Sequence, residues 1–389
     1  MLKSDPERIL HVACLSNFLV MLGVGIANPV VPLFAATFPV SYTVVGFAVG
    51  IFGLARIAFE IPAGIWADRF GRRPMLNFGL LLFTVSGFTA FLASNIVVLS
   101  IARFIQGIGM GLYITPALAL LGDIAPQEKV AKYFTTYFVY DYLGSAIGPA
   151  LGGFASQYAG FKAAFLLLAG ISGAALLLTY LMISETSLGG ESAHFQEIIQ
   201  SFKSTRDWRL LLVGCTAAAS FFLSSGIQNT AMPLLGKYQG LSVGEIGLIL
   251  SAAAFVNAFA IFVGKGLIDR LGGPKLLVIS FSSTALVLAF FPMAFGFLAL
   301  TLMTAFVSIT MSLVPSTQSA MATDIAHPAH RAFTFSLYRT FGDGSLLVGP
   351  VFIGFLSDLY GFSAPFYAAA IICLVTLLPA WGLKVMKPK

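Results

Sequence analysis

The chain has 389 residues, of which 58% are hydrophobic and 10% charged, and its formal net charge is +6. A soluble domain is roughly 45–50% apolar and about 25% charged. The composition, with a mean hydropathy of +0.91, therefore excludes an ordinary soluble protein and predicts an integral membrane protein.

Long apolar runs follow one another along the whole chain. A helix needs about 20 mostly apolar residues to cross the hydrocarbon core of a membrane. Twelve runs are long enough, so we predict twelve transmembrane helices. Their approximate ranges are 9–35, 41–67, 75–94, 97–123, 131–157, 161–183, 209–236, 243–268, 275–295, 297–322, 332–357 and 362–383.

Positive charges are distributed unevenly between the predicted loops. Cytoplasmic loops of membrane proteins are enriched in Lys and Arg. The loops on one side contain only Lys162 and Lys237, whereas sixteen Lys and Arg residues lie on the other side. We therefore expect both termini and the central loop to be cytoplasmic in a multi-pass protein of the cell membrane. The sixteen are Lys3, Arg8, Arg69, Arg72, Arg73, Lys129, Lys132, Lys203, Arg206, Arg209, Arg270, Lys275, Arg331, Lys384, Lys387 and Lys389.

The second half of the chain repeats the first at an offset of 201 residues. Gly148-Pro149 recurs as Gly349-Pro350, and Asp123-Ile124-Ala125 recurs as Asp324-Ile325-Ala326. An even number of crossings separates the repeats, so the two halves have the same orientation. Parallel halves of six helices are the arrangement of major facilitator transporters. The predicted parts are an N-terminal six-helix bundle of residues 1–183, a cytoplasmic linker of residues 184–208 and a C-terminal six-helix bundle of residues 209–389.

Three segments carry a resemblance to that superfamily. They are GIWADRFGRRPML at 64–76, LSIARFIQGIGMG at 99–111 and GSAIGPALGG at 144–153. The first two resemble superfamily signatures, and the third resembles a signature of its drug:proton antiporter branch. The resemblance covers the whole chain. It implies an all-α integral membrane fold with twelve transmembrane helices in two six-helix pseudo-symmetric bundles, a working monomer and secondary transport by alternating access.

Arg56 and Glu60 lie four residues apart in the second predicted helix, and Arg339 and Asp343 repeat this spacing in the eleventh. Residues at i and i+4 share a helix face, so each pair can form a salt bridge. Charges at membrane depth are expensive and mark functional positions. Glu60 and Asp343 are therefore candidates for proton coupling. Alternatively, each pair neutralises itself and only fixes helix packing.

The loop after the second helix concentrates charge. The resemblance implies that this loop is a gating clasp between the two halves, in which Asp68 faces the N-terminus of helix 11, where the helix dipole is positive. The nearby arginines can pair with Asp123, and glycine permits a tight turn and close approach. Alternatively, the arginines are ordinary anchors of the cytoplasmic side. The predicted clasp comprises Gly64, Asp68, Arg69, Gly71, Arg72, Arg73 and Asp123.

Asp141 is the favoured proton carrier. It lies about 10 residues into the fifth helix, which at about 1.5 Å per residue is near the middle of the bilayer. Arg103 in the fourth helix is its predicted electrostatic partner. A cavity that opens to each side in turn would change the surroundings of the carboxylate, so that it loads and releases a proton. Alternatively, Asp141 forms a permanent structural pair with Arg103 or with a tyrosine.

Small residues recur in the fifth helix. Gly144, Gly148 and Gly152 lie every four residues and form a flat face for close packing, and Pro149 removes a backbone hydrogen bond and permits a kink. With Gly153 they form the antiporter-like segment, and we expect a tight seal between helices 5 and 8 that favours exchange. Alternatively, the segment serves helix packing alone.

Other polar residues inside the predicted spans are candidates for substrate contact. Arginine binds anionic groups well, and uncharged amides can line a substrate path. The candidates are Arg56, Arg103, Arg339, Gln228, Asn229 and Asn257.

The sequence contains no phosphate-binding loop, no nucleophile–base arrangement and no metal-ligand spacing. The cysteines Cys14, Cys215 and Cys373 are scattered within predicted spans. We therefore expect no enzymatic activity, no cofactor, no metal and no nucleic-acid partner. Transport then depends on an ion gradient or is passive.

The function that we predict is proton-coupled efflux of small lipophilic or amphipathic compounds. Its partners would be the small-molecule substrate, protons and the lipid bilayer. The alternatives are a carrier of a specific metabolite such as a sugar or an organic anion, a lipid flippase, and a membrane receptor or scaffold that moves no solute.

Overall fold

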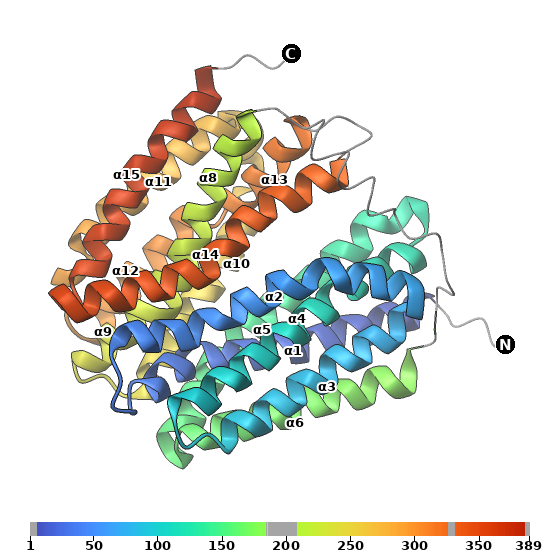
Figure 1. Ribbon diagram of the computed structural model, residues 1–389. Helices are drawn as coiled ribbons and strands as arrows, with labels where there is room; N and C mark the ends of the chain where they lie inside the picture. The colour runs from blue at the N-terminus through green and yellow to red at the C-terminus, as the bar shows by residue number, and fades with distance from the viewer. Residues whose placement is uncertain (1–5, 184, 186–207, 326–330, 386–389) are drawn as a thin grey trace. The chain divides into compact units, whose positions relative to one another are not determined.

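The computed structural model describes residues 6–183, 185, 208–325 and 331–385, and the regular elements of these residues are all helices (Figure 1). For residues 61, 265, 269, 331–339, 384 and 385 only the backbone is described. The predicted linker 184–208 lies outside the described residues, except for Glu185 and Trp208. The predicted division into 1–183, 184–208 and 209–389 stays a prediction.

Six long helices form from the six apolar runs of the first half. Gly71 and Gly160 separate two of the helix pairs with φ of 100° and 81°, a conformation that glycine adopts without steric cost. The helices are α1 (Pro6–Ala35), α2 (Tyr42–Phe70), α3 (Arg72–Phe91), α4 (Ile96–Ile124), α5 (Val130–Ala159) and α6 (Phe161–Met182).

The second half follows the same plan with two interruptions. Its first span consists of α8, the π-helical segment η2 and α9, and its fourth span consists of α12 and α13. The bounds are α8 (Trp208–Phe222), η2 (Leu223–Ala231), α9 (Met232–Tyr238), α10 (Val243–Leu271), α11 (Gly273–Phe290), α12 (Gly296–Met311), α13 (Val314–Ile325), α14 (Arg331–Tyr360) and α15 (Ala364–Val385).

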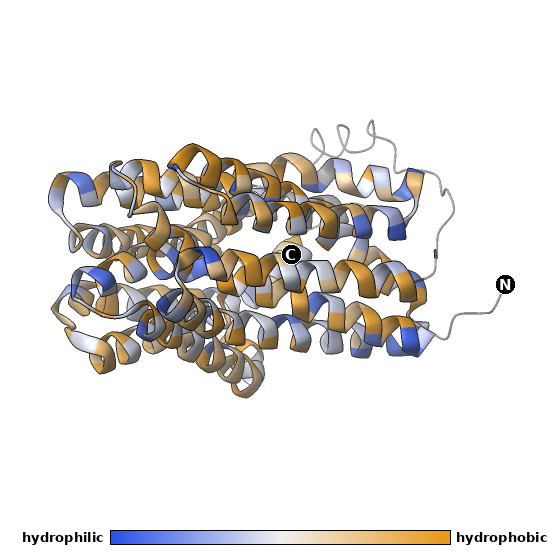
Figure 2. Ribbon diagram, turned by 90° about the horizontal axis from the view of Figure 1, so that it is seen from below, coloured by the Kyte–Doolittle hydropathy of each residue, from blue (hydrophilic) through white to orange (hydrophobic). Residues whose placement is uncertain are grey.

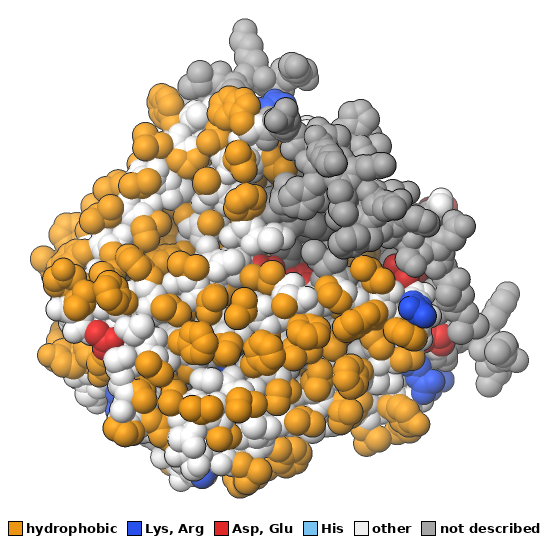
Figure 3. All heavy atoms as spheres, in the orientation of Figure 1, with side chains coloured by type: hydrophobic (Ala, Val, Ile, Leu, Met, Phe, Trp, Pro, Cys, Tyr) orange, Lys and Arg blue, Asp and Glu red, His pale blue; other side chains and the backbone are white. Residues whose placement is uncertain are grey.

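Eleven helical segments of the described chain are long and apolar enough to cross a membrane. The twelfth long helix, α5, has 30 residues, but Asp141, several tyrosines and its glycines lower its hydropathy. Hydrophobic residues dominate the helices between their ends (Figure 2). Apolar side chains also cover most of the described surface on the face drawn in Figure 3. This surface suits hydrocarbon, as the composition predicted.

Equivalent helices pack in equivalent pairs in the two halves. α1 packs against α5 and α6, and α3 packs against α4 and α6 (Figure 1). Their counterparts do the same, since α8 packs against α14 and α15, and α11 packs against α12 and α15. The internal repeat in the sequence is therefore also a structural repeat.

The chain forms two compact units, and each takes one helix start from the other half of the sequence. Unit 1 consists of Met1–Phe38, Ile51–Ala193 and Ser242–Ser251, and unit 2 consists of Pro39–Gly50, His194–Leu241 and Ala252–Lys389. The start of α2 thus belongs to unit 2, and the start of α10 belongs to unit 1.

The glycines of α5 allow this helix to touch α1 backbone to backbone. A Cβ on Gly148 would lie 2.5 Å from the carbonyl oxygen of Leu22, and a Cβ on Gly152 would lie 2.4 Å from that of Ile26. Gly153 instead faces the start of α10, where its Cβ would lie 2.6 Å from the carbonyl oxygen of Val243. The small residues of α5 therefore contact two helices. Gly148 and Gly152 face α1, and Gly153 faces α10.

We expect the substitution Gly148→Ala to push α1 and α5 apart and to destabilise the protein by about 1–3 kcal/mol, the usual cost of overpacking. The apparent melting temperature of the purified protein in detergent should fall by a few degrees. Gly170→Ala in α6 is the matched control, because nothing lies within 4 Å of a Cβ at that position. Equal melting temperatures for the two variants would contradict this account of α5.

The first turns of α2 and α10 are each capped by a side chain, and the two capping residues occupy equivalent positions of the repeat. Asp358 at the end of α14 accepts hydrogen bonds from the backbone N–H groups of Tyr42 and Thr43, both at 2.8 Å, and from the Thr43 hydroxyl at 2.6 Å. Gln157, which precedes Asp358 by the repeat offset, accepts one from the N–H of Gly244 at 3.0 Å. Such acceptors satisfy N–H groups that a helix start leaves without a partner.

The two caps differ in strength. α10 has a second device, because the Glu245 carboxylate accepts from the N–H of Ser242 at 2.8 Å while the Ser242 hydroxyl accepts from the N–H of Glu245 at 3.2 Å. This reciprocal arrangement is a capping box. At the start of α2, Ser41 accepts a weaker bond from Val44 at 3.4 Å. The start of α2 therefore depends more on Asp358 than the start of α10 depends on Gln157.

Asp358→Ala should loosen the first turn of α2 by about 1–2 kcal/mol, because it removes three accepted hydrogen bonds and a carboxylate at a helix N-terminus. Hydrogen–deuterium exchange of the peptide that contains residues 42–50 should become about tenfold faster. Gln157→Ala is the control and should change exchange at residues 243–251 much less, since the capping box remains. The account of the caps is wrong if Gln157→Ala has the larger effect.

Candidate functional site

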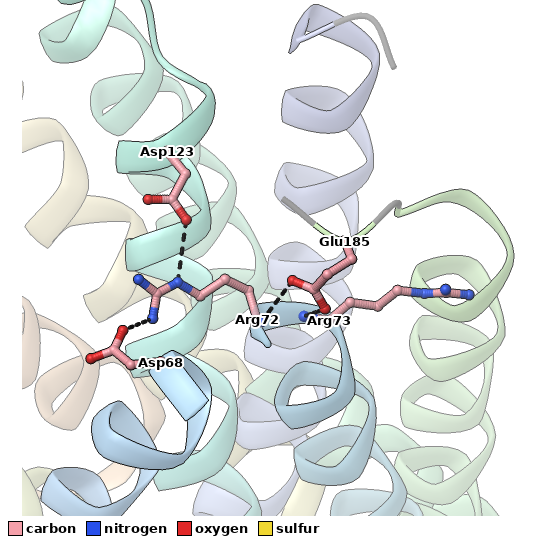
Figure 4. A network of polar contacts seen from close by, with 5 residues as sticks. All are labelled: Asp68, Arg72, Arg73, Asp123 and Glu185. Atoms are coloured by element: carbon pink, nitrogen blue, oxygen red, sulfur yellow. Dashed lines mark hydrogen bonds and ion pairs between the residues drawn. The ribbon is translucent and has the colours of Figure 1, made fainter. Parts of the chain in front are cut away.

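A charged cluster lies where α2, α3, α4 and the end of α6 meet (Figure 4). α2 ends at Phe70, Gly71 turns the chain with φ of 100°, and α3 begins at Arg72. The turn places the arginines of the loop at the start of α3, beside the end of α4. The charged cluster comprises Asp68, Arg72, Arg73, Asp123 and Glu185.

Arg72 bridges two carboxylates. Its Nη1 pairs with Asp68 one turn before it in the chain, and its Nε donates to Oδ2 of Asp123 at 3.2 Å. The two ends of the guanidinium are thus used together, as its fork of donors allows. The sequence predicted a contact between the loop arginines and Asp123, and the structure shows that Arg72 makes it.

Glu185 was not found from the sequence. Its carboxylate accepts hydrogen bonds from the backbone N–H groups of Arg72 at 2.9 Å and Arg73 at 3.2 Å. An anion at this position complements the positive end of α3. Glu185 follows α6 and lies far from α3 in the sequence, so no local signal linked them.

The other predicted members of the clasp are less engaged. Arg73 donates to the carbonyl oxygen of Tyr180 at 2.6 Å, and its guanidinium lies 5.3 Å from the centre of that ring. Arg69 is exposed beside the ring of Phe70. A Cβ on Gly64 would meet Thr115 at an ordinary 3.6 Å. All the contacts of the charged cluster described here lie within unit 1, and a clasp to the eleventh predicted span, which is α14, stays a prediction.

Asp141 lies in a second group of side chains from α1, α4 and α5, which we call the polar cluster. Oδ2 of Asp141 accepts a hydrogen bond from Nδ2 of Asn17 at 3.3 Å, and the same amide reaches the carbonyl oxygen of Tyr137 at 3.5 Å. The hydroxyl of Tyr113 meets that of Ser16 at 3.3 Å. The polar cluster comprises Ser16, Asn17, Tyr113, Tyr137 and Asp141.

Arg103 is 6% exposed and is held within α4 and by α2. Its Nη1 donates to Oε1 of Gln106 at 2.6 Å, and its guanidinium lies 4.7 Å from the centre of the Phe52 ring. A flat cation over an aromatic face is favourable when it is removed from water. The predicted electrostatic partnership with Asp141 stays a prediction.

The structure describes both side chains of only one of the two predicted i, i+4 pairs. Nε of Arg56 lies 3.7 Å from Oε2 of Glu60, and both side chains are largely buried. Asp343 is 2% exposed in α14, whereas the side chain of Arg339 lies outside the described part of the chain. The structure therefore shows the first pair, and the second stays a prediction.

Two of the predicted substrate residues meet at Ser308 in unit 2. Nε2 of Gln228 donates to the Ser308 hydroxyl at 3.0 Å, and Nδ2 of Asn257 donates to the Ser308 carbonyl oxygen at 3.2 Å. Gln228 and its neighbour Asn229 lie in the π-helical segment η2, and such departures from the α-helix are frequent at functional sites. We call Gln228, Asn257 and Ser308 the amide site.

Ser308 was missed because a serine in an apolar helix has many ordinary explanations. The repeat offers the signal that could have found it. Ser308 follows Gly107 of the second motif by 201 residues, and Thr304 takes the place of Arg103. Ser308 thus occupies the motif position of α12 that corresponds to the region around Arg103 in α4.

An apolar hollow of about 810 Å³ lies between α8, α14 and α15 in unit 2. It is lined by Cys215, whereas Cys14 at the equivalent position of the first half is buried with 1% exposure. The predicted site residues with described side chains are not among its lining residues. Among the residues that the structure describes, no three His, Cys, Asp or Glu side chains gather as a metal site.

The comparisons with known proteins agree with this architecture. The family model described as "Major Facilitator Superfamily" matches residues 13–223 and 214–389. "Multidrug resistance protein 2" of Bacillus subtilis (strain 168) is 24% identical over 388 residues, which cover 96% of this chain and 94% of the relative. "Quinolone resistance protein NorA" of Staphylococcus aureus is 24% identical over 355 residues, which cover 90% of each chain.

A solved structure of a bacterial homologue of the human lysosomal transporter Spinster, in an inward-facing and unoccupied conformation, is also similar. It has a TM-score of 0.82 at 17% identity and covers 98% of both chains. This likeness confirms the predicted all-α membrane fold. The family match confirms the predicted secondary transporter and excludes an enzyme. The chain therefore belongs to the major facilitator superfamily and is a multi-pass membrane transporter of small molecules.

Proposed function

We propose that this transporter exports small lipophilic or amphipathic compounds in exchange for protons, from a cell membrane in which both of its termini are cytoplasmic. The observation that carries the proposal is Asp141, an ionisable group in the interior of α5 that accepts a hydrogen bond from Asn17. Such a group is retained despite its cost. Two relatives named for multidrug and quinolone resistance support the choice of substrate, and the excess of Lys and Arg supports the orientation.

In this proposal Asp141 binds a proton when the carrier is open to the acidic outer side. The proton removes the charge, so the side chain is less costly to enclose in an apolar bundle. When the carrier opens to the cytoplasm, water and the lower proton concentration favour release. Substrate moves in the opposite direction on the same cycle. Glu60 and Asp343 are further candidates for proton binding.

The amide site supplies the contact for the polar part of the substrate. Gln228 and Asn257 are only half-buried, and each amide has donor and acceptor capacity beyond the single bond that it makes to Ser308. Asn229 adjoins them in η2. The surrounding spans are apolar and suit the lipophilic part of the substrate.

The amide site also favours a second candidate function. Uncharged donors and acceptors around Ser308 suit hydroxyl groups as well as carbonyl groups. A metabolite such as a sugar is therefore the second candidate. The carrier would then discriminate against analogues that lack one hydroxyl, because the half-buried amides of Gln228 and Asn257 would lose a hydrogen-bond partner.

Everted membrane vesicles test the first function. Addition of a lipophilic cation to vesicles energised by respiration should collapse part of the pH gradient, since each exported molecule moves protons out of the vesicle. Asp141→Asn should abolish this effect. Glu128→Gln, which neutralises an exposed carboxylate outside the predicted spans, is the control and should behave as the natural protein does.

Two results would contradict the proposal in different ways. If Asp141→Asn still collapses the gradient, another group carries the proton. If no lipophilic cation moves protons with the natural protein, the exchange itself is wrong, and uptake of radiolabelled sugars becomes the next measurement.

The charged cluster gives a separate test of the predicted clasp. Arg72→Ala leaves Asp68 and Asp123 without their shared cation, so we expect transport to fall about tenfold or more in a protein that still folds. Arg72→Lys should rescue it only in part, because an ammonium group cannot bridge two carboxylates in the same fixed geometry. Transport is measured as efflux from loaded cells.

Arg69→Ala is the matched control, because Arg69 lies in the same loop but is exposed. It should leave transport almost unchanged. Equal losses for Arg69→Ala and Arg72→Ala would show that the loop acts through its positive charge alone, as an anchor of the cytoplasmic side.

A further inference from the structure

Asn17 has an unusual place in the polar cluster. Its side chain is fully buried, with 0% exposure, although it lies on a helix with a mostly apolar surface. Nδ2 faces Oδ2 of Asp141 at 3.3 Å, but Oδ1 has no hydrogen-bond partner among the described residues. A buried amide oxygen without a partner is rare in proteins and calls for an explanation.

The protonation of the neighbouring Asp141 offers an explanation for this unpaired oxygen. An ionised carboxylate can only accept hydrogen bonds, whereas a protonated carboxylic acid also donates one. A side-chain amide has a donor on one side and an acceptor on the other. Rotation of the amide by half a turn about the Cβ–Cγ bond exchanges Nδ2 and Oδ1. Asn17 can therefore satisfy Asp141 in either protonation state.

The surroundings make such a partner necessary. Tyr113 and Tyr137 are almost completely buried, at 1% and 0% exposure. Asp141 interacts electrostatically with Tyr113 of α4 and with Tyr137 and Tyr142 of α5, and Cys14 of α1 interacts with Tyr113 and Tyr137. Phenols and thiols are neutral at neutral pH unless they are strongly perturbed. Asp141 is thus the group of the polar cluster whose charge is most ready to change.

The internal repeat provides a comparison within the same chain. At the offset of 201 residues, Asp141 corresponds to Gly342 and Asn17 corresponds to Ala218. The second half thus has no carboxylate at the position of Asp141, although Asp343 adjoins it, and no amide at the position of Asn17. The absence of both groups agrees with a role of Asn17 that depends on Asp141.

We propose that Asn17 is a positioning residue that changes from hydrogen-bond donor to hydrogen-bond acceptor when Asp141 takes up a proton. The proton passes to and from the Asp141 carboxylate, and Asn17 neither gains nor loses one. This inference rests on the proposed proton coupling at Asp141. It adds the group that keeps both forms of the half-buried acid hydrogen-bonded.

Infrared spectroscopy of the purified full-length protein, without substrate, tests it directly. The carbonyl band of a protonated carboxylic acid, assigned by its loss in Asp141→Asn, is followed against pH. In Asn17→Leu, which keeps the size but removes both hydrogen bonds, the midpoint should move by about one pH unit, a tenfold change in proton affinity. In Asn17→Ser, whose hydroxyl can donate and accept, the change should be smaller.

Asn77→Leu is the matched control. Asn77 lies in α3, and its Oδ1 accepts a hydrogen bond from the Thr179 hydroxyl at 2.7 Å. Its removal should leave the Asp141 band and its midpoint unchanged. An Asn17→Leu midpoint equal to that of the natural protein overturns the proposal, and so does an Asp141 band in the natural protein that does not respond to pH.

A second measurement needs no destabilising substitution. In protein labelled with ¹³C at the asparagine side chains, one amide band should shift with the same midpoint as the Asp141 band, and the shift should vanish in Asp141→Asn. A labelled amide band that stays constant through the titration overturns the switch even if Asn17→Leu does not fold.

Transport gives a third readout that separates positioning from a structural role. Asn17→Leu should lower proton-driven transport about tenfold but leave substrate counterflow, which needs no proton gradient, near the level of the natural protein. An equal loss of both overturns the proposal. The infrared measurements need no substrate. Their result therefore tests the role of Asn17 even if the proposed efflux function is wrong.

Discussion

The hydrocarbon core of a membrane offers no hydrogen-bond partner, and most of this structure follows from that constraint. Helices provide hydrogen-bond partners for the backbone N–H and C=O groups. Side-chain hydroxyl groups donate to a backbone carbonyl oxygen of the preceding turn, as the Thr304 hydroxyl does to Leu300 at 2.7 Å. Charged side chains are few, and several of those described have partners from the protein. Arg103 uses an amide and an aromatic face, and Arg72 uses two carboxylates. Each remaining polar group at membrane depth therefore asks for a functional reason.

The two halves share one backbone plan and differ in their polar chemistry. At equivalent positions Arg103 becomes Thr304, Asp141 becomes Gly342, and the neutral cap Gln157 becomes the charged cap Asp358. Ionisable groups at depth are thus more prominent in α4 and α5, whereas amides and a hydroxyl gather at Ser308. In the proposed function, the favoured proton-binding group, Asp141, lies in the first half, and the amide site that recognises uncharged polar groups lies in the second.

Sequence reasoning succeeded where a local pattern decides the outcome. The apolar run at 131–157 became α5 (Val130–Ala159), and the run at 41–67 became α2 (Tyr42–Phe70). It failed where the outcome depends on a partner elsewhere in the chain. The nine-residue π-helix η2 interrupts the apolar run 209–236, which predicted one continuous helix. Glu185 and Ser308 were not predicted as site residues, because no neighbouring residue in the sequence indicates their contacts.

The sequence by itself determined that the chain enters a membrane, how its helices follow one another, and that it repeats, because transfer into hydrocarbon and helix formation depend on composition and on spacing within about 20 residues. Only the tertiary structure decided which polar groups meet. Arg72 reaches Asp123 across 51 positions, and Asn17 reaches Asp141 across 124. Such contacts depend on the rotation of each helix about its axis and on the helix that packs against it, and these are set jointly by side chains spread over the whole bundle.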